Sequence, residues 1–352
     1  IITITGANAN QFSVQQQPST PVAPSSSTTF IIRFSPTSAG IKTASISISN
    51  NDPDENPYDL TITGAASESY SLLTTYQTPP DVLIELGGGK GIDLDSSGNI
   101  YFTDAFLGGG HGWIYRFDSA GNYLTPAWDL GRMESIYGFT IDTLHSDAKY
   151  YSNWYYISPN LQYMVFRIGG GSWGSTGSGD GQFDMPIALC CDEDGNVYVL
   201  DKNNHRVQKF TSTGTFLTKW GTQGAGDGQF NSPGGIACDG TNIYVSDTGN
   251  NRIQVFDKNG GFIRKWGSLG NGPSQFNSPG KIAFCRAAGP NQGLYVLDGY
   301  MNDRIMKFNS QGDFIAAWHP SNFPKAIAAN NSGVYGLRSS GQTGYIDVYR
   351  KD

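Results

Sequence analysis

The sequence predicts an all-β protein with two parts: a six-bladed β-propeller over residues 81–352 and an incomplete β-sandwich over residues 1–66, joined by a linker at 67–80. Three observations predict this fold class. One segment recurs at steps of 45 to 50 residues, short alternating apolar runs are separated by Gly- and Asn-rich turns, and no long stretch shows helical apolar spacing.

The composition of the chain fits many short strands joined by tight turns. Its 352 residues are too many for one ordinary core, and they include 46 Gly, a residue that readily adopts the positive φ angles of such turns. No apolar run reaches transmembrane length. The sequence begins without Met and without a signal peptide, so we expect a mature or cut-down chain.

The repeat is clearest in "PGGIACD", which opens a unit at Pro233. Related segments occur at residues 91–95, 138–142, 186–192, 233–239, 279–285 and 324–330. Within one copy, "GGIACD", "NIYVSD", "RIQVFD" and "GFIRKWG" predict four strands, separated by turns such as "DEDGN" and "DKNGG". Six four-stranded sheets stacked radially give a six-bladed propeller, in which each sheet covers the next.

The second turn of three copies carries a more specific signature. "DKNNHRVQKF", "DTGNNRIQVF" and "DGYMNDRIMKF", each followed by a Gly-containing turn and an aromatic strand, resemble NHL repeats. The resemblance covers roughly residues 81–352. It implies a propeller used mainly as a binding platform for protein partners, in a family that also contains a few lyases.

Ring closure needs one strand from outside the last copy. That copy ends at "GYIDVYRKD" without a fourth strand, whereas "DVLIELG" (81–87) is a strand with no copy of its own. Residues 81–87 are therefore predicted to be the clasp strand, paired beside residues 345–349.

The first 66 residues alternate with period two. "FSPTSAG" and "NNDPDENPYDLTITG" resemble the Hydin-type (choice-of-anchor type) immunoglobulin-like domains of bacterial secreted and surface proteins, which implies an extracellular or cell-surface location. Only the later part of such a domain is present, with five strands.

An incomplete sandwich is expected to have an open edge at its first strand. We predict this assembly edge at Ile1, Ile2, Thr3, Ile4 and Thr5, and we expect Ile31, Phe34, Ile46 and Ile48 to be only partly covered. Either upstream residues of the same polypeptide complete the sandwich, or another chain adds a strand. The second alternative predicts self-association, in a filament or a surface layer.

Polar residues recur in the second turn of three blades. These are Asp201, His205, Arg206, Asp247, Arg252, Asp298 and Arg304. Ion pairs or backbone bonds inside each blade explain them, but their recurrence also places equivalent groups around one face, which is the predicted recognition surface. A second set, Asp95, Asp142, Asp192 and Asp239, either caps the turn that follows it or forms a ring of carboxylates.

The second copy is unusual in its aromatic stretch "YYSNWYYISPNLQY" (150–163). Tyr151, Trp154 and Tyr156 either pack in the core or stack on a ligand such as a carbohydrate or on a partner chain.

Catalytic and metal motifs are not found. A zinc-dependent lyase of this fold would resemble the amidating lyases, whose metal histidines follow the Pro that opens a blade; here those positions are Ile187, Gly234, Gly280 and Lys325. His111 and His145 could meet across blades but lack a third ligand. We predict no metal site, except that Asp52, Asp54 and Glu55 form a loop that either binds Ca²⁺ or is simply solvated.

The four cysteines are predicted to be buried free thiols. Cys190, Cys191, Cys238 and Cys285 lie in apolar runs, and equivalent inner-strand positions are expected to lie beyond the roughly 7 Å Cα separation that a disulfide allows.

The function predicted from the sequence is a non-enzymatic extracellular or cell-surface binding and assembly protein. The first alternative is a lyase or hydrolase acting in the propeller channel. The last is a nucleic-acid platform, because residues 201–307 hold 12 Lys or Arg against 7 Asp, although the net charge of −7 disfavours it. No membrane span is expected.

Overall fold

We describe the chain from a computed structural model. It describes residues 1–19, 27–37, 40–49, 57–66, 68–79, 91–105, 111–132, 135–143, 148–157, 160–299, 301–340 and 343–352. The chain forms two compact units, Ile1–Glu68 with Asp313–Ala316, and Ser69–Gly312 with Ala317–Asp352. The helices described, η1 (Ala9–Gln11) and η2 (Thr248–Asn250), are three-residue turns, so none could cross a membrane.

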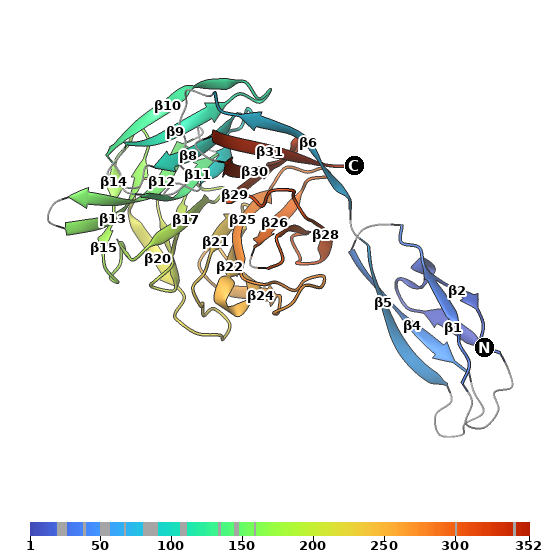
Figure 1. Cartoon of the computed structure of the whole chain (residues 1–352). Helices are drawn as coiled ribbons and strands as arrows, with labels where there is room; N and C mark the ends of the chain where they lie inside the picture. Colours follow the sequence, from blue (N-terminus) through green and yellow to red (C-terminus); the bar gives the residue numbers. More distant parts are fainter. Residues whose placement is uncertain are drawn as a thin grey trace. The chain divides into compact units, whose positions relative to one another are not determined.

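The larger unit is a six-bladed propeller of four-stranded antiparallel sheets, as predicted (Figure 1). Blade one is β7 (Ile92–Leu94), β8 (Ile100–Ala105), β9 (His111–Phe117) and β10 (Tyr123–Arg132). Blade two is β11 (Ser135–Asp142), β12 (Ala148–Ile157), β13 (Asn160–Arg167) and β14 (Ser172–Trp173). Blade three is β17 (Pro186–Cys191), β18 (Val197–Asp201), β19 (Arg206–Phe210) and β20 (Phe216–Trp220), preceded by the short parallel pair β15 (Ser175–Thr176) and β16 (Gln182–Phe183).

The last three blades follow the same order. Blade four is β21 (Gly235–Cys238), β22 (Asn242–Asp247), β23 (Arg252–Asp257) and β24 (Phe262–Trp266). Blade five is β25 (Pro279–Cys285), β26 (Gly293–Asp298), β27 (Arg304–Phe308) and β28 (Phe314–Trp318). Blade six is β29 (Ala326–Asn330), β30 (Gly333–Ser340), β31 (Thr343–Lys351) and β6 (Tyr70–Gln77).

The first strands of the blades form a closed circle. Each of β7, β11, β17, β21, β25 and β29 contacts the next, and β29 contacts β7. These strands therefore line a central channel, where any ligand would meet residues from several blades.

The strand that closes the ring differs from the prediction. β6 pairs with β31 over the register from Tyr345↔Gln77 to Lys351↔Tyr70, so the clasp lies in the segment predicted as a linker. The assignment of the clasp to residues 81–87 is wrong because β6 already occupies the edge of β31; residues 81–87 themselves lie outside the described residues. The clasp Tyr70 also stacks on Trp318 of blade five, with ring centroids 4.4 Å apart.

Tryptophans from the outer strands pack between neighbouring blades. Trp220 of blade three lies over Phe256 of blade four at a centroid distance of 5.8 Å, and Trp266 of blade four lies over Phe308 of blade five at 5.7 Å. Each indole also covers a turn glycine of the next blade. At Gly260, a built Cβ would lie 2.6 Å from the Trp220 ring, so only glycine fits there.

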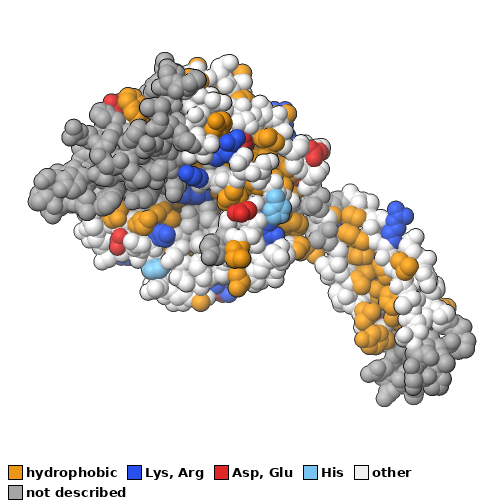
Figure 2. Space-filling view, viewed as in Figure 1, with side chains coloured by type: hydrophobic (Ala, Val, Ile, Leu, Met, Phe, Trp, Pro, Cys, Tyr) orange, Lys and Arg blue, Asp and Glu red, His pale blue; other side chains and the backbone are white. Residues whose placement is uncertain are grey.

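The described residues of the first 66 positions form five strands in two sheets. One sheet has the order β1 (Ile2–Thr5), β4 (Gly40–Ile48), β5 (Tyr58–Ala66), and the other pairs β2 (Phe12–Gln16) with β3 (Ile31–Phe34). Figure 2 shows hydrophobic side chains gathered on the surface of the smaller unit. Its immunoglobulin-like assignment stays a prediction.

The predicted partial covering of four apolar residues holds for three. Ile31 is 53% exposed, and Phe34 and Ile48 are half-buried. The expectation is wrong for Ile46, which is fully buried; it lies inside β4 between Ile4 and Leu60, whereas Ile48 is the last residue of that strand.

The predicted assembly edge at Ile1–Thr5 is partly occupied. The Ser49 N–H donates to the Ile1 carbonyl, so Ile2 and Ile4 direct their backbone groups away from β4. At Ile2, however, both groups are bonded to the side chain of Gln17, whose Oε1 accepts the N–H at 3.0 Å and whose Nε2 donates to the carbonyl. Of the two residues whose backbone groups point away from β4, Ile4 is therefore the one at which an added strand could pair.

Candidate functional site

The predicted recognition residues form a buried clamp in three blades. In blade four, Arg252 Nε donates to Asp247 Oδ2 at 2.8 Å, and its two terminal nitrogens donate to three carbonyls of the loop at residues 225–229. Asp247 Oδ1 accepts the Asn231 N–H at 2.7 Å. The equivalent pairs Arg206–Asp201 and Arg304–Asp298 have distances of 2.8 and 3.0 Å.

These clamps confirm the intrablade ion pairs and correct the recognition surface. All three carboxylates are fully buried and all three arginines nearly so, and each is bonded to its own blade. Buried and saturated groups cannot meet a ligand, so they do not make the predicted surface. His205 is half-buried in a left-handed conformation (φ 51°), and its Nδ1 accepts the Ser232 N–H at 3.3 Å.

A cavity of about 410 Å³ opens at the end of the channel where the first strands begin. We call it the lysine mouth, because Lys202, Lys281 and Lys325 line it from three different blades. Its apolar wall consists of Ile136, Met185, Ile187, Leu297, Phe323 and Pro324. No acidic side chain belongs to its described lining, so the mouth combines positive charge with apolar surface.

The four positions that follow a blade-opening Pro do converge on this mouth. Ile187, Gly234, Gly280 and Lys325 all line it. They are the positions where an amidating lyase would carry metal histidines, and this chain places a lysine at one of them instead.

Lys281 reaches across the channel. Its Nζ donates to the Ile187 carbonyl of blade three at 2.5 Å, and the residue lines the cavities at both ends of the channel. Blades three, four and six have Ala188, Gly235 and Ala326 at the equivalent position. A register shift between Pro279 and Ile282 accompanies the long side chain in β25.

The other end of the channel holds a cavity of about 640 Å³ lined by all six blades, which we call the inner cavity. Asp93 lies in its wall, and its Oδ2 accepts the Ile141 N–H at 2.8 Å and the Thr140 hydroxyl at 3.1 Å. Burial raises the pKa of Asp93 above its ordinary value in spite of these bonds.

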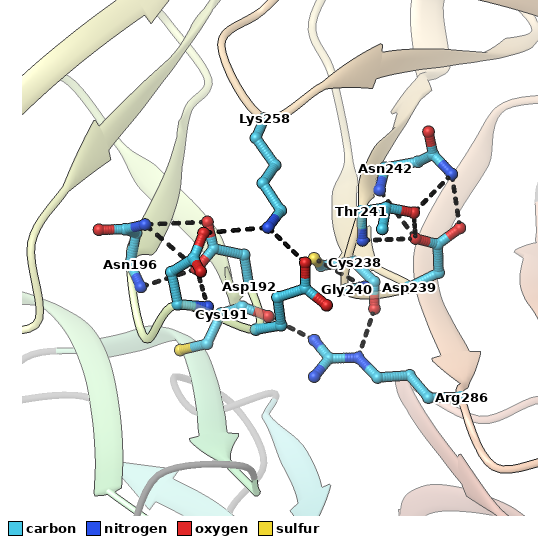
Figure 3. A network of polar contacts seen from close by, with 12 residues as sticks. Cys191, Asp192, Asn196, Cys238, Asp239, Gly240, Thr241, Asn242, Lys258 and Arg286 are labelled. Carbon is cyan, nitrogen blue, oxygen red and sulfur yellow. Dashed lines mark hydrogen bonds and ion pairs between the residues drawn. The ribbon is translucent and has the colours of Figure 1, made fainter.

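Arg286 ties three blades together at the inner cavity (Figure 3). Its Nε donates to the Cys238 carbonyl at 2.9 Å, and Nη2 donates to the Cys191 carbonyl. Nearby, Lys258 of blade four bridges Glu193 and Asp194 of blade three at 2.6 and 3.0 Å.

The acidic residues that end the first strands cap turns. Asp192 accepts the backbone N–H of Asp194 and of Asn196, each at 2.9 Å, together with the Tyr198 hydroxyl at 2.8 Å. Asp95 and Asp239 make equivalent bonds. For these three residues the turn-cap interpretation is confirmed.

All four cysteines are buried free thiols, as predicted. The remaining predicted sites are not described. The side chains of Tyr151, Trp154, Tyr156 and His111 lie outside the described side chains, and Asp52, Asp54, Glu55 and His145 lie outside the described residues. Among the described residues, no group of three His, Cys, Asp or Glu is placed to hold a metal ion.

Comparison with known proteins gives the repeat type. The NHL repeat family matches residues 183–210, and a family described as 6-bladed beta-propeller matches residues 229–319. The larger unit is therefore a six-bladed propeller in which residues 183–210 match an NHL repeat. Protein lin-41 of Caenorhabditis elegans is 44% identical over 48 residues, which are 14% of this chain and 4% of that protein's length. NHL propellers commonly mediate protein interactions.

Two solved structures share the fold at 14% identity. A structural genomics protein of unknown function from Bacteroides thetaiotaomicron aligns with a TM-score of 0.53 over 98% of this chain and 92% of its own. A streptogramin B lyase aligns with a TM-score of 0.50 over 80% of this chain and 98% of its own. At this identity the likeness establishes the fold alone.

Sequence reasoning missed Lys202, Lys281 and Arg286 and noted Lys325 only as a departure from a lyase. Each of these residues differs from the residue at the equivalent position of other blades. Lys202, for example, occupies the position of Thr248 in blade four and Gly299 in blade five. A signal was therefore present, in the differences between copies.

Proposed function

We propose that this chain is a non-enzymatic binding and assembly protein whose propeller recognises an acidic segment of a partner protein at the lysine mouth. The observation that carries the proposal is the convergence of Lys202, Lys281 and Lys325 on one cavity with an apolar wall. A volume of about 410 Å³ accommodates two or three side chains and lies in the usual range of ligand sites.

The chemistry of the mouth favours carboxylates attached to an apolar body. The ammonium groups attract negative charge, and the apolar wall buries the carbon atoms of the ligand. A segment that alternates acidic and aromatic residues meets both requirements. Its backbone would enter from the face on which Lys202 and Lys325 lie.

A charge-matched pair of variants tests this assignment. Lys202→Gln/Lys325→Gln removes two charges at the mouth, and Lys219→Gln/Lys265→Gln removes two from outer strands, where these lysines are 44% and 45% exposed. The probe is a fluorescein-labelled peptide of alternating Asp and Phe, followed by fluorescence anisotropy at low salt. Exposed charge pairs contribute about 0.2–1 kcal/mol each, so the first variant should bind about two- to thirtyfold more weakly and the second should bind like wild type.

Three outcomes contradict the proposal. Equal weakening in both variants would mean that only net charge matters. Tighter binding of a single-stranded oligonucleotide would favour the nucleic-acid alternative, since that binding follows phosphate charge. Conversion of the probe into products would favour an enzyme.

Self-association through the smaller unit is the second half of the proposal. Because Ile46 and Ile48 direct their backbone groups towards β5, the groups of Asp59, Thr61 and Thr63 point away from the sheet. No described strand pairs with this nine-residue edge, whereas the β1 edge is partly blocked by Gln17. Strand addition is therefore proposed at β5.

A proline scan distinguishes the edges. Thr61→Pro removes an outward N–H without touching the bonds to β4, and Thr61→Val retains it as the matched control. Light scattering should show that Thr61→Pro abolishes oligomers that wild type and Thr61→Val form. A wild-type chain that stays monomeric at all concentrations would refute self-association. The extracellular or cell-surface location stays a prediction, to be checked by fractionation of the source cells.

A further inference from the structure

Two thiols from neighbouring blades line the inner cavity and share one apolar cluster. Cys190 of β17 and Cys238 of β21 belong to the apolar cluster between blades three and four. Cys191 belongs instead to the cluster between blades two and three. The cross-blade pair is therefore Cys190 with Cys238, a combination that comparison of equivalent repeat positions does not reveal.

The surroundings of Cys238 stabilise a thiolate. Its Sγ accepts the Gly240 N–H at 3.4 Å, and the Arg286 Nε donates to the Cys238 carbonyl at 2.9 Å. The Cys190 hydrogen bond lowers the pKa of Cys238, against the effect of burial and with the help of Arg286. Burial raises the pKa of Cys190, Cys191 and Cys285.

Cys190 and Cys238 have slightly larger exposed fractions than the other two cysteines. All four line the inner cavity, but Cys190 and Cys238 keep 6% and 4% of their surface exposed, against 2% and 1% for Cys191 and Cys285. A reagent small enough to enter a cavity of about 640 Å³ would reach the wall to which this pair belongs.

We propose that Cys238 is a reactive thiol and Cys190 its resolving partner, together forming a modification site for small disulfides that ends in a disulfide between blades three and four. The site lies at the opposite end of the channel from the lysine mouth and does not depend on the function proposed there.

The chemistry is two successive thiol–disulfide exchanges. The Cys238 thiolate attacks one sulfur of a disulfide R–S–S–R, which forms a Cys238–S–S–R bond and releases one thiolate. The Cys190 thiol gives its proton to the released thiolate, and its sulfur then attacks Cys238 Sγ and expels the second thiolate, which takes a proton from solvent. In total, two protein thiols are oxidised and one small disulfide is reduced to two thiols.

The test uses the full chain in its native state and bis(2-hydroxyethyl) disulfide as the probe. After acid quenching, intact mass and peptide mapping identify the products. Wild type should lose two hydrogen atoms, retain no adduct, and yield linked peptides that contain Cys190 and Cys238. Cys190→Ala should retain one hydroxyethylthio adduct on Cys238, because the attack proceeds but cannot be resolved.

Matched variants separate this site from general thiol reactivity. Cys190→Ala is well suited, because blades four and five have Ala237 and Ala283 at the equivalent position. Cys238→Ala should stay unmodified over the same period, and Cys191→Ala and Cys285→Ala should behave like wild type. Tryptophan fluorescence confirms that each variant is folded.

Three results would overturn the proposal. The first is a native wild-type chain that does not react, and the second is an adduct that forms first on Cys191 or Cys285. The third is a wild-type chain that keeps a stable mixed disulfide on Cys238, which would show that Cys190 cannot reach it.

Discussion

Removing one arginine from a repeated clamp should destabilise the propeller far more than removing a surface lysine of the same blade. The perturbation is Arg252→Met, which keeps the aliphatic stem and deletes the guanidinium. The matched control is Lys265→Met, whose Nζ lies 2.5 Å from Asp227 on the surface. Both variants lose one charge and one ion pair of blade four.

The structure sets the magnitude of each effect. Arg252 is 6% exposed, and its loss leaves the fully buried Asp247 without its ion-pair partner and the carbonyls of Ala225 and Gly226 without the hydrogen bonds that Arg252 donates. Breaking a buried pair from one side costs about 3–5 kcal/mol. Lys265 is 45% exposed, and solvent-exposed pairs contribute about 0.2–1 kcal/mol.

Urea unfolding followed by tryptophan fluorescence measures both free energies of unfolding. The double variant Asp247→Asn/Arg252→Met tests the cause, because it no longer leaves an unpaired buried charge. Its destabilisation should be at least about 1 kcal/mol smaller than the sum of the two single variants. Additive losses, or an Arg252→Met value within about 1 kcal/mol of Lys265→Met, would refute the clamp as a source of stability.

Three further predictions concern turns and ring closure. Burial opposes the charge of Asp192, but hydrogen bonds from Asn196 and Tyr198 hold its pKa below the ordinary value. The ionised Asp192 carboxylate therefore stabilises the fold at pH values above its pKa in the unfolded chain, and this stabilisation is lost as the pH falls through its pKa in the folded chain. Asp192→Asn should lower the free energy of unfolding by about 1–3 kcal/mol near pH 7 and by little near pH 2, as measured by urea titration. Gly260→Ala should destabilise the fold by about 2–5 kcal/mol, because φ is +90° and the Trp220 ring lies 2.6 Å from the new Cβ. Gly181→Ala, with φ +74° but open space around the new Cβ, should cost about 1–2 kcal/mol. Thermal unfolding of both variants measures this difference. Deleting Tyr70–Gln77 should lower the melting temperature and accelerate hydrogen exchange in β31, and unchanged exchange there would contradict the role of β6 as the clasp.

The blades could be predicted from the sequence because their determinants are local. "NIYVSD" and "RIQVFD" alternate between the two faces of a sheet, and they became β22 and β23 with the bounds Asn242–Asp247 and Arg252–Asp257. The Asp192 turn could be predicted as well, because its carboxylate accepts hydrogen bonds from residues two to six positions further on.

The closing strand could not be located in the same way. "YSLLTTYQ" (70–77) and "DVLIELG" (81–87) are both short runs of strand-forming residues, and nothing local distinguishes them. The choice depends on pairing with β31, for example Thr74 with Val348, more than 250 residues away in the chain. Strand counting correctly required a clasp from the N-terminal side but could not choose between neighbouring candidates.

The predicted recognition surface failed for a reason specific to repeat proteins. A residue that recurs in several blades serves a need that those blades share, and here Asp247, Arg252 and their counterparts hold the loop that enters the blade. A ligand in the central channel contacts several blades at once, so the residues that bind it need not recur from blade to blade. Groups that could recognise it are therefore expected where one blade departs from the others, as Lys281 does where blades three and four have Ala188 and Gly235. By the same argument, Arg286 and Cys190 mark the inner cavity as a second place where this ring has been specialised.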